Sequence, residues 1–284
     1  MKYRSIAAVT LLISSVTRPA FADLDDGLVA YFPFDGNTAD ATANHNDGVN
    51  MGATLTTDHY GNPNSAYAFD GTVYISVPNS ESLASLKKQY SVTAWVKVAA
   101  WTYALAPMIC KGTTPTHAQY RPSFNASGYF DLHGGVAVDT SFSPALNTWY
   151  FIAATWNNGT AKVFVNGAQI GKVTGALPVE VNDEALEIGR DQPGSVEYLN
   201  GALDEIRIYN RTLSEAEITE LYGPPPIGGS VKGLSSKSVL CKNQTSSQSV
   251  TIPLNGVKSW DCTAAGLTAN SGDIIVQTVK GVSP

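Results

Sequence analysis

The chain has 284 residues and a formal net charge of −6, from 18 lysines and arginines against 24 aspartates and glutamates. An acidic chain without a basic cluster argues against nucleic acid and anionic membranes as partners, and it is compatible with neutral glycans or cations. Its length can bury a sizeable core and allows one or two domains.

The first 22 residues predict export. They read MKYRSIAAVTLLISSVTRPAFA, a basic start followed by a short apolar run and an A-x-A cleavage site. We therefore expect a bacterial-type signal peptide over 1–22 and a mature chain that is secreted, periplasmic or on the cell surface. No later segment approaches the roughly 20 apolar residues of a membrane-spanning helix.

Most of the mature chain has the pattern of short strands separated by Gly, Asn, Asp and Pro. The expected strands cover 28–34, 66–69, 74–77, 91–98, 149–156, 161–165 and 202–209. After the strand 161–165, Asn166-Gly167 is typical of a two-residue hairpin turn that needs positive φ at both positions. Many evenly spaced antiparallel strands predict an all-β sandwich or jelly roll.

One helix is expected, and it closes the first domain. Ser214 and Glu217 have the spacing of a capping box, and Gly223 followed by three prolines ends the helix after Tyr222. The expected domains are 23–223, a Pro/Gly linker at 224–229, and a small β domain at 230–284. Strands are expected in the small domain at 238–242, 249–254 and 273–279.

The chain has three cysteines. In an oxidising compartment the two that are close in sequence, Cys241 and Cys262, are expected to form a disulfide that stabilises the small domain by roughly 3 kcal/mol. Cys110 then remains as a buried free thiol that packs as a small hydrophobic residue.

Four segments, taken in order, resemble one family. They are LVAYFPFDGNTADATANHNDG, YSVTAWVKV, NTWYFIAATWNNGTAKVFVNGAQIG, and LEIGRD leading to LNGALDEIRIYNRTLSEAEITELY. Residues 23–223 thereby resemble the LamG-like (laminin-G type 3, concanavalin A-like lectin/glucanase) jelly roll of secreted bacterial proteins. The resemblance implies an antiparallel β-sandwich of two sheets, one of them concave, that acts as a non-catalytic binding module.

Asp204 raises a question that the resemblance helps to answer. Strict alternation places it on the same strand face as Ile206 and Ile208, and a buried carboxylate needs a metal, a cation or backbone N–H groups. The resemblance implies a calcium ion where the opening segment meets the last long strand. The candidate ligands are Asp35, Asn37, Asp40 and Asp204. The alternatives are a polar turn that caps its own backbone and a carboxylate at a wet strand end.

Catalysis is not expected. Sandwich-fold glycoside hydrolases carry an E-x-D-x-x-E strand with two glutamates on one face, whereas Glu184 and Glu187 are three residues apart and would point to opposite faces. The four histidines have no metal-ligand spacing. A glycoside hydrolase therefore stays the less favoured alternative.

The segment 101–133 is the expected ligand-binding region, because it mixes aromatic and charged residues. Aromatic faces stack on sugar rings while polar neighbours bind hydroxyls. The candidates are Trp101, Tyr103, Tyr120, Arg121 and Tyr129, with core packing of alternate aromatics as the alternative. Three other tryptophans, at 95, 149 and 156, are assigned to the core. The expected partner is a glycan or an extracellular or surface protein, and the alternative function is a structural or adhesive surface protein without sugar binding.

Overall fold

The structure is a computed structural model. It describes residues 24–112, 118–133, 136–175, 181–191 and 197–223, and the strands 228–230, 236–243, 249–253, 259–261 and 275–281. The chain divides into two compact units, Met1–Tyr222 and Gly223–Pro284. The segment 1–22, for which a signal peptide is predicted, lies outside the described residues. Within the described part, no helix is long and apolar enough to cross a membrane.

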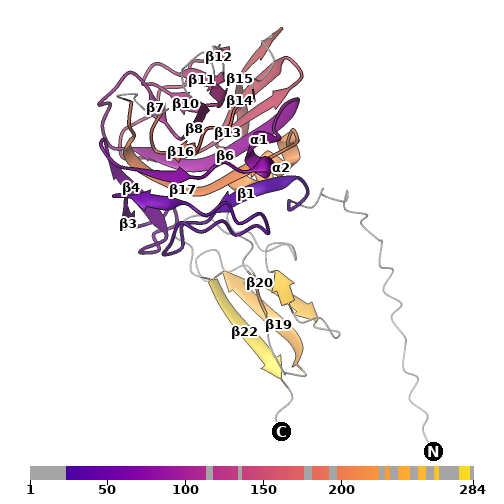
Figure 1. Cartoon of the computed structure of the whole chain (residues 1–284). Helices are drawn as coiled ribbons and strands as arrows, with labels where there is room; N and C mark the ends of the chain where they lie inside the picture. The colour runs from indigo at the N-terminus through magenta and orange to yellow at the C-terminus, as the bar shows by residue number, and fades with distance from the viewer. Residues whose placement is uncertain are drawn as a thin grey trace, which may run out of the picture. The chain divides into compact units, whose positions relative to one another are not determined.

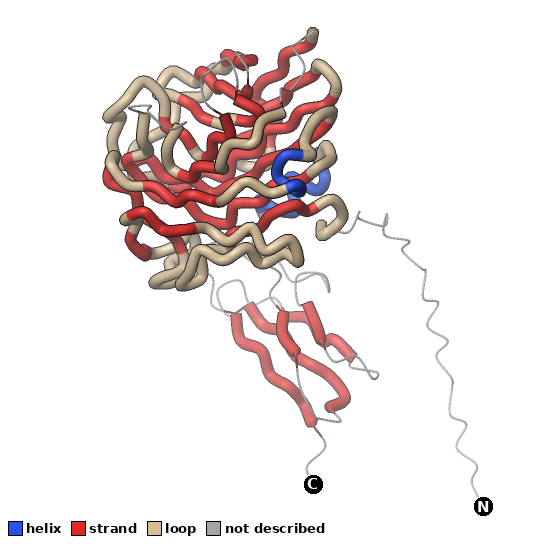
Figure 2. Tube along the Cα trace, viewed as in Figure 1, coloured by secondary structure: helices blue, strands red, loops and turns tan. Residues whose placement is uncertain are grey.

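The first unit is an antiparallel β-sandwich (Figures 1 and 2). One layer is an eight-stranded sheet of order β15-β14-β13-β6-β17-β4-β3, with β1 also paired to β17. Its strands are β1 (Leu28–Phe32), β3 (Thr54–Thr56), β4 (Ala66–Asp70), β6 (Gln89–Val98), β13 (Trp149–Asn157), β14 (Thr160–Val165), β15 (Ala168–Thr174) and β17 (Asn200–Tyr209). Six of these strands, β1, β4, β6, β13, β14 and β17, match runs that the sequence predicts, within two residues at each end, whereas β3 and β15 were not among the expected strands.

The opposite layer contains two smaller sheets. The first has the order β2-β5-β16-β8-β9 and the second has the order β12-β11-β10-β7. Their strands are β2 (Val49–Met51), β5 (Tyr74–Val77), β16 (Leu186–Ile188), β8 (Ile109–Gly112), β9 (Ala118–Tyr120), β7 (Ala106–Pro107), β10 (Ser123–Phe124), β11 (Tyr129–His133) and β12 (Val136–Asp139). Backbone bonds from Arg121 N to Leu132 O (2.5 Å) and from Met108 N to Pro122 O (3.0 Å) join the two sheets.

The main hydrophobic core lies between these layers, because alternate residues of facing strands point inward. Its members include Val92, Ala94 and Val96 of β6, Leu186 and Ile188 of β16, and Phe130 and Leu132 of β11. A second cluster covers the other face of the large sheet under helix α2 (Glu215–Tyr222) and includes Phe151, Ala153, Phe164, Tyr209 and Ile218. Each face of the large sheet therefore has its own apolar packing.

Local signals place the turns and the helix. Asn166 and Gly167 have φ of 49° and 80°, which confirms the predicted hairpin turn between β14 and β15. The expected capping box is also present: Ser214 Oγ accepts from Glu217 N (3.2 Å) and Glu217 Oε2 accepts from Ser214 N (2.7 Å). The short helix α1 (Glu81–Ala84) was not expected.

A β-bulge in β17 changes the faces of that strand. Glu205 has a φ of 53°, and the register with β6 shifts between Asp204 and Arg207. As a result Leu203, Ile206 and Ile208 all reach the main core. The expectation that Asp204 shares a face with Ile206 and Ile208 is therefore wrong, because the bulge breaks the strict alternation on which it rested.

The second unit also consists of strands in its described parts. A two-stranded sheet pairs β18 (Gly228–Ser230) with β21 (Ser259–Asp261), and a three-stranded sheet has the order β20-β19-β22, formed by Ser249–Pro253, Ser236–Asn243 and Ile275–Gly281. Cys241 lies on β19 opposite Val250 and Gln277. Cys262 lies outside the described residues, so the disulfide stays a prediction.

Candidate functional site

The outer face of the smaller sheets is polar and tightly bonded. Leu186 and Ile188 point into the core, so Glu187 between them points to the opposite face. The Glu187 carboxylate accepts from the Ser76 hydroxyl (3.2 Å) on the neighbouring strand and pairs with Arg190 (3.2 Å). Burial raises the pKa of Glu187, although Arg190 opposes the change.

Arg121 is the centre of this face. It follows β9, and its guanidinium donates from Nη2 to Asp131 Oδ2 (2.5 Å) and from Nη1 to Asp191 Oδ2 (2.9 Å). The side chains of Arg121, Asp131 and Asp191 are only 4%, 9% and 2% exposed. Burial opposes the charge of Arg121, but the two carboxylates outweigh burial and raise its pKa. A buried arginine held on two sides is fixed in orientation.

An open pocket of about 540 Å³ lies over this network. It is lined by Ala104, Leu105, Arg121, Asn125, Ser127, Tyr129, Asp131, Asp139 and Glu197. Asn125 Oδ1 accepts from the backbone N–H groups of Ser127 (3.0 Å) and Tyr129 (3.2 Å), which holds one wall of the pocket. Tyr129 is half-buried and lines this space.

The structure places the five predicted ligand-binding residues differently. Only Arg121 and Tyr129 line the pocket. Trp101 is partly buried and packs edge-on against Phe124, with ring centroids 5.9 Å apart. The Tyr103 hydroxyl donates to Gly71 O (3.4 Å).

Tyr120 does not reach the surface, so its prediction as a ligand-binding residue is wrong. It is 0% exposed and lies in the main core, where its ring is 5.9 Å from that of Tyr90. It therefore has no surface to offer a ligand, because the alternation that turns Arg121 outward turns Tyr120 inward.

Five polar lining residues were not among the candidates. Asn125, Ser127 and Asp131 lie inside the expected ligand-binding segment 101–133, and Asp139 and Glu197 lie outside it. The sequence does contain a signal for Asp139. Val136 and Val138 are apolar residues two positions apart that pack in the core, so the alternation of the strand places Asp139 on its outer face. Glu197 follows a loop, and no periodicity places it. The pKa of Glu197 is raised by burial and by a hydrogen bond with Asp191, so these two carboxyl groups are neighbours.

Cys110 lies opposite Glu187 in the register of β8 and β16. It is buried and forms no disulfide within the described residues, as predicted. Burial and the nearby Asp191 carboxylate raise the pKa of its thiol well above the ordinary value. The thiol therefore stays protonated and unreactive at neutral pH.

Two of the three tryptophans assigned to the core are only partly buried. Trp156 is 1% exposed and is a core residue as expected. Trp95 packs against the second cluster beside α2, and Trp149 carries the Lys97 ammonium 4.8 Å from its ring centroid. Both side chains lie on the outer face of the large sheet. They were assigned to the core because β6 and β13 carry apolar residues on both of their faces.

Asp204 has a histidine as its partner. His59 Nδ1 lies 2.6 Å from Asp204 Oδ2, and the two side chains are 4% and 2% exposed. The His59 ring stacks on Trp95 with centroids 4.0 Å apart and an interplanar angle of 14°. Burial raises the pKa of Asp204 to about 6, and the His59 hydrogen bond opposes that change. The pair fastens the loop before β4 to the large sheet.

The Asp40 carboxylate accepts hydrogen bonds from nearby backbone and side-chain groups. Its Oδ1 accepts from Tyr31 N and Thr42 N, each at 2.9 Å, and its Oδ2 accepts from Asn46 N at 2.9 Å and from the Thr42 hydroxyl at 2.8 Å. Asn37 Oδ1 accepts from Ala39 N (2.8 Å), a turn in which a side chain caps its own backbone.

The four predicted calcium ligands do not come together as a calcium site. Asp35 and Asn37 are exposed, Asp40 is saturated with N–H and O–H donors, and Asp204 is bonded to His59. Within the described ranges, no three His, Cys, Asp or Glu side chains are gathered closely enough to hold one metal ion. Calcium therefore stays a prediction from the resemblance, and the arrangement of these residues does not fit it.

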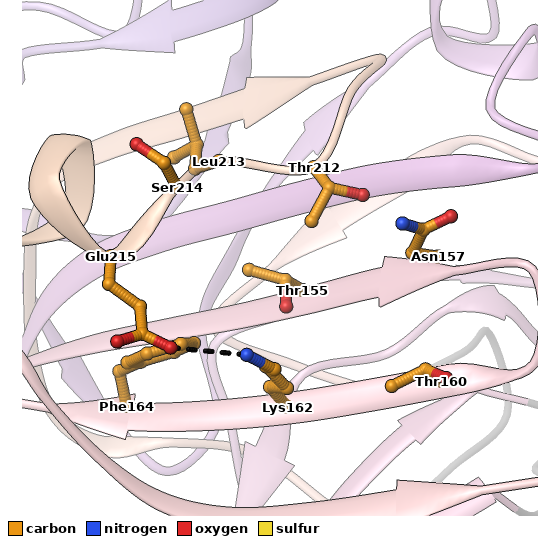
Figure 3. A pocket seen from close by; sticks show the side chains of 9 residues that line it. All are labelled: Thr155, Asn157, Thr160, Lys162, Phe164, Thr212, Leu213, Ser214 and Glu215. Atoms are coloured by element: carbon orange, nitrogen blue, oxygen red, sulfur yellow. Dashed lines mark hydrogen bonds and ion pairs between the residues drawn. The ribbon is translucent and has the colours of Figure 1, made fainter.

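A second pocket, of about 460 Å³, lies on the outer face of the large sheet beside the start of α2 (Figure 3). Thr155, Thr160 and Thr212 bring hydroxyl groups to it, and Phe164 lies under one end. Lys162 and Glu215 form an ion pair (3.1 Å) across that end. The pocket is thus polar but internally neutral.

The model of the concanavalin A-like lectin/glucanases superfamily matches residues 69–219, which is more than half of the chain. The chain belongs to this superfamily. The two-layered jelly roll expected from the four sequence segments is thereby confirmed. No curated protein gives a significant match.

Solved structures share the superfamily fold at low identity. One is domain 4 of AbnA, a GH43 extracellular arabinanase from Geobacillus stearothermophilus, in complex with arabinotriose; it is 22% identical, with a TM-score of 0.56, over 69% of this chain and 98% of that domain. Another is Trypanosoma rangeli sialidase, 20% identical with a TM-score of 0.52, over 69% of this chain. This chain covers only 32% of the sialidase.

Proposed function

We propose that the first unit is a non-catalytic glycan-binding module and that its ligand lies in the pocket over Arg121. One observation carries this proposal: Tyr129 borders an open space whose floor is a fixed network of charged groups. An aromatic face beside ordered donors and acceptors is the usual composition of a sugar site. The sugar ring would stack on Tyr129 while its hydroxyls bond to Asn125 and Asp131.

The network favours binding because it is already ordered. Arg121 is fixed by Asp131 and Asp191, and the Asn125 side chain fixes the loop that leads to Tyr129. A ligand that binds to immobile groups loses less free energy to side-chain ordering. The fold relationship to an arabinanase domain solved with arabinotriose supports carbohydrate as the ligand class, as an analogy between folds.

We infer that the carboxyl groups of this face support the structure and do not hydrolyse a glycan. Retaining glycosidases use two carboxyl groups about 5 Å apart, of which one attacks the sugar and the other donates a proton. Here Glu187 is tied to Ser76 and Arg190, and Asp191 is tied to Arg121. We propose that they serve as scaffold.

Export is part of the same proposal. The N-terminal 22 residues support a secreted or surface location, where polysaccharides are available as ligands. The small second unit would then serve as a spacer or attachment domain, or as a contact for an extracellular protein.

Binding of soluble oligosaccharides by the full chain tests the proposal. We expect Tyr129→Ala to abolish binding without loss of folding, because the stacking face is removed. The matched control is Tyr60→Ala, a 47%-exposed tyrosine outside the pocket, which should bind as the unmodified chain does. Binding that survives Tyr129→Ala, or no binding to any oligosaccharide, contradicts the proposed site. Release of reducing sugar that Asp191→Asn stops would contradict the non-catalytic assignment.

A further inference from the structure

Lys111 is a buried cation that the proposed glycan site does not use. It lies opposite Leu186 in the register of β8 and β16, and directly opposed residues point to the same side of a sheet. Leu186 belongs to the main core, so the Lys111 side chain begins on the core side, and the residue is 0% exposed. A lysine is costly to bury in such a place, so the contacts of its amino group call for an explanation.

The amino group of Lys111 lies against the segment that leads into β16. Its Nζ donates to Glu184 O (2.6 Å), to Asn182 O (3.0 Å) and to the side-chain Oδ1 of Asn182 (3.3 Å). Asn182 Nδ2 in turn donates to the backbone oxygen of Lys111 (3.3 Å). The amine of Lys111 and the side-chain amide of Asn182 are therefore held next to each other.

The surroundings favour the neutral amine, which is the nucleophilic form of a lysine. Burial lowers the pKa of Lys111 to about 8, although the charges of Asp183 and Glu184 oppose this change. About half of the Lys111 side chains are therefore neutral at that pH. Buried lysines with a lowered pKa are the ones that act as nucleophiles in proteins.

The Asn182 amide is the matching electrophile. Glu184 N donates to Asn182 Oδ1 (3.1 Å), so a backbone N–H group polarises this carbonyl and can stabilise negative charge on its oxygen. Because Cγ is about 1.2 Å from Oδ1, Lys111 Nζ is at most about 4.5 Å from Cγ. A shift of about 1 Å would bring the two atoms to the roughly 3–3.5 Å of a near-attack arrangement.

We propose that Lys111 and Asn182 form an isopeptide bond within the folded chain. The neutral Nζ attacks Asn182 Cγ, so that an N–C bond forms while the bond from Cγ to Nδ2 breaks and ammonia leaves. The proton that Nζ loses goes to the departing Nδ2, carried by a neighbouring carboxylate, Asp183 or Glu184, whose charges act on Lys111. The reaction consumes no oxidant and no other reactant.

The bond would give the first unit a covalent link that a disulfide cannot supply. Cys110 is the one cysteine of residues 1–222, so this unit has no partner for an internal disulfide. A link between residues 71 positions apart restricts the unfolded chain as a disulfide does. The inference is independent of glycan binding, because neither Lys111 nor Asn182 lines the pocket over Arg121.

Mass spectrometry of the full chain tests the proposal. The chain is kept folded at a pH of about 8–9 for about a day, where the amine is abundant, and is then reduced and denatured. Once the N-terminus of the purified chain has been determined, we expect a mass about 17 Da below that of the sequence, because one ammonia has been lost. A tryptic digest should contain a branched peptide that joins Lys111 to Asn182, with no cleavage after Lys111.

Three variants separate this bond from other losses of ammonia. Lys111→Met and Asn182→Ala should each have the full mass of their sequence, whereas Lys162→Met, which removes a lysine on the large sheet, should keep the loss. A loss that remains in Lys111→Met would come from a cyclised asparagine elsewhere and would overturn the proposal. An unshifted mass with no branched peptide in the unmodified chain would also overturn it, whether or not the variants fold.

Discussion

The buried pair of Asp204 and His59 predicts an unusual pH dependence of stability. The perturbation is Asp204→Asn, which keeps the shape of the side chain and removes its proton equilibrium. In the folded chain burial raises the pKa of Asp204 from its ordinary value of 3.8 to about 6. Between these two pH values the folded chain therefore holds a proton that the unfolded chain releases.

The sign follows from that proton. Its binding stabilises the folded state at low pH, so the contribution of Asp204 is fully present below pH 3.8 and is lost as the pH rises through about 6. The change from 3.8 to about 6 corresponds to about 3 kcal/mol, since each tenfold change in proton affinity is worth about 1.4 kcal/mol. The 2% exposure of this side chain means that solvent screens little of this effect.

The assay is urea unfolding, followed by tryptophan fluorescence, at closely spaced pH values between about 4 and 7. Relative to Asp204→Asn, the unmodified chain should lose about 3 kcal/mol of unfolding free energy across this interval. His59→Gln should move the loss to higher pH, because the His59 hydrogen bond holds the Asp204 pKa down. Asp139→Asn, which removes an exposed carboxylate, is the matched control. Parallel pH profiles for the unmodified chain and Asp204→Asn, or a rise in place of a fall, would refute the reasoning.

Three further outcomes are expected. Chelation of calcium should leave the melting temperature within about 1 °C; a loss of several degrees that Asp204→Asn abolishes would restore the calcium site. Ser214→Ala should lower the unfolding free energy by about 1 kcal/mol because α2 loses its cap, and no change would mean that packing alone holds the helix. Thiol titration of the denatured chain should count one free cysteine, Cys110, with Cys241 and Cys262 bridged, and three free thiols would exclude the bridge.

The fold could be predicted because its signals are local. Asn166-Gly167 permits a tight turn wherever it occurs, and the Ser214 and Glu217 pair caps a helix within one turn. Long strands with strong apolar patterns were found for the same reason. The short strands between 106 and 139 were missed, because two to five residues carry too little periodicity.

The site was predicted only in part, because it depends on long-range contacts. Arg121 and Tyr129 were identified from residue type, but the pairing of Arg121 with Asp191 joins residues 70 positions apart. His59 was not connected with Asp204, which is 145 positions away. Tyr120 was misassigned because chemical character alone does not show which face of a strand a side chain occupies.

The bulge at Glu205 accommodates one extra residue in β17 while the apolar residues keep their face. Deletion of Glu205 would restore strict alternation, with Leu203, Ile206 and Ile208 still pointing into the main core and Arg207 pointing away from it. The strand would lose the local bend and the contacts of the Glu205 carboxylate with the Tyr31 hydroxyl and with Arg207. We therefore expect homologous chains to have either the same number of residues between Leu203 and Ile208 or one fewer, with the apolar residues on the same face in both cases.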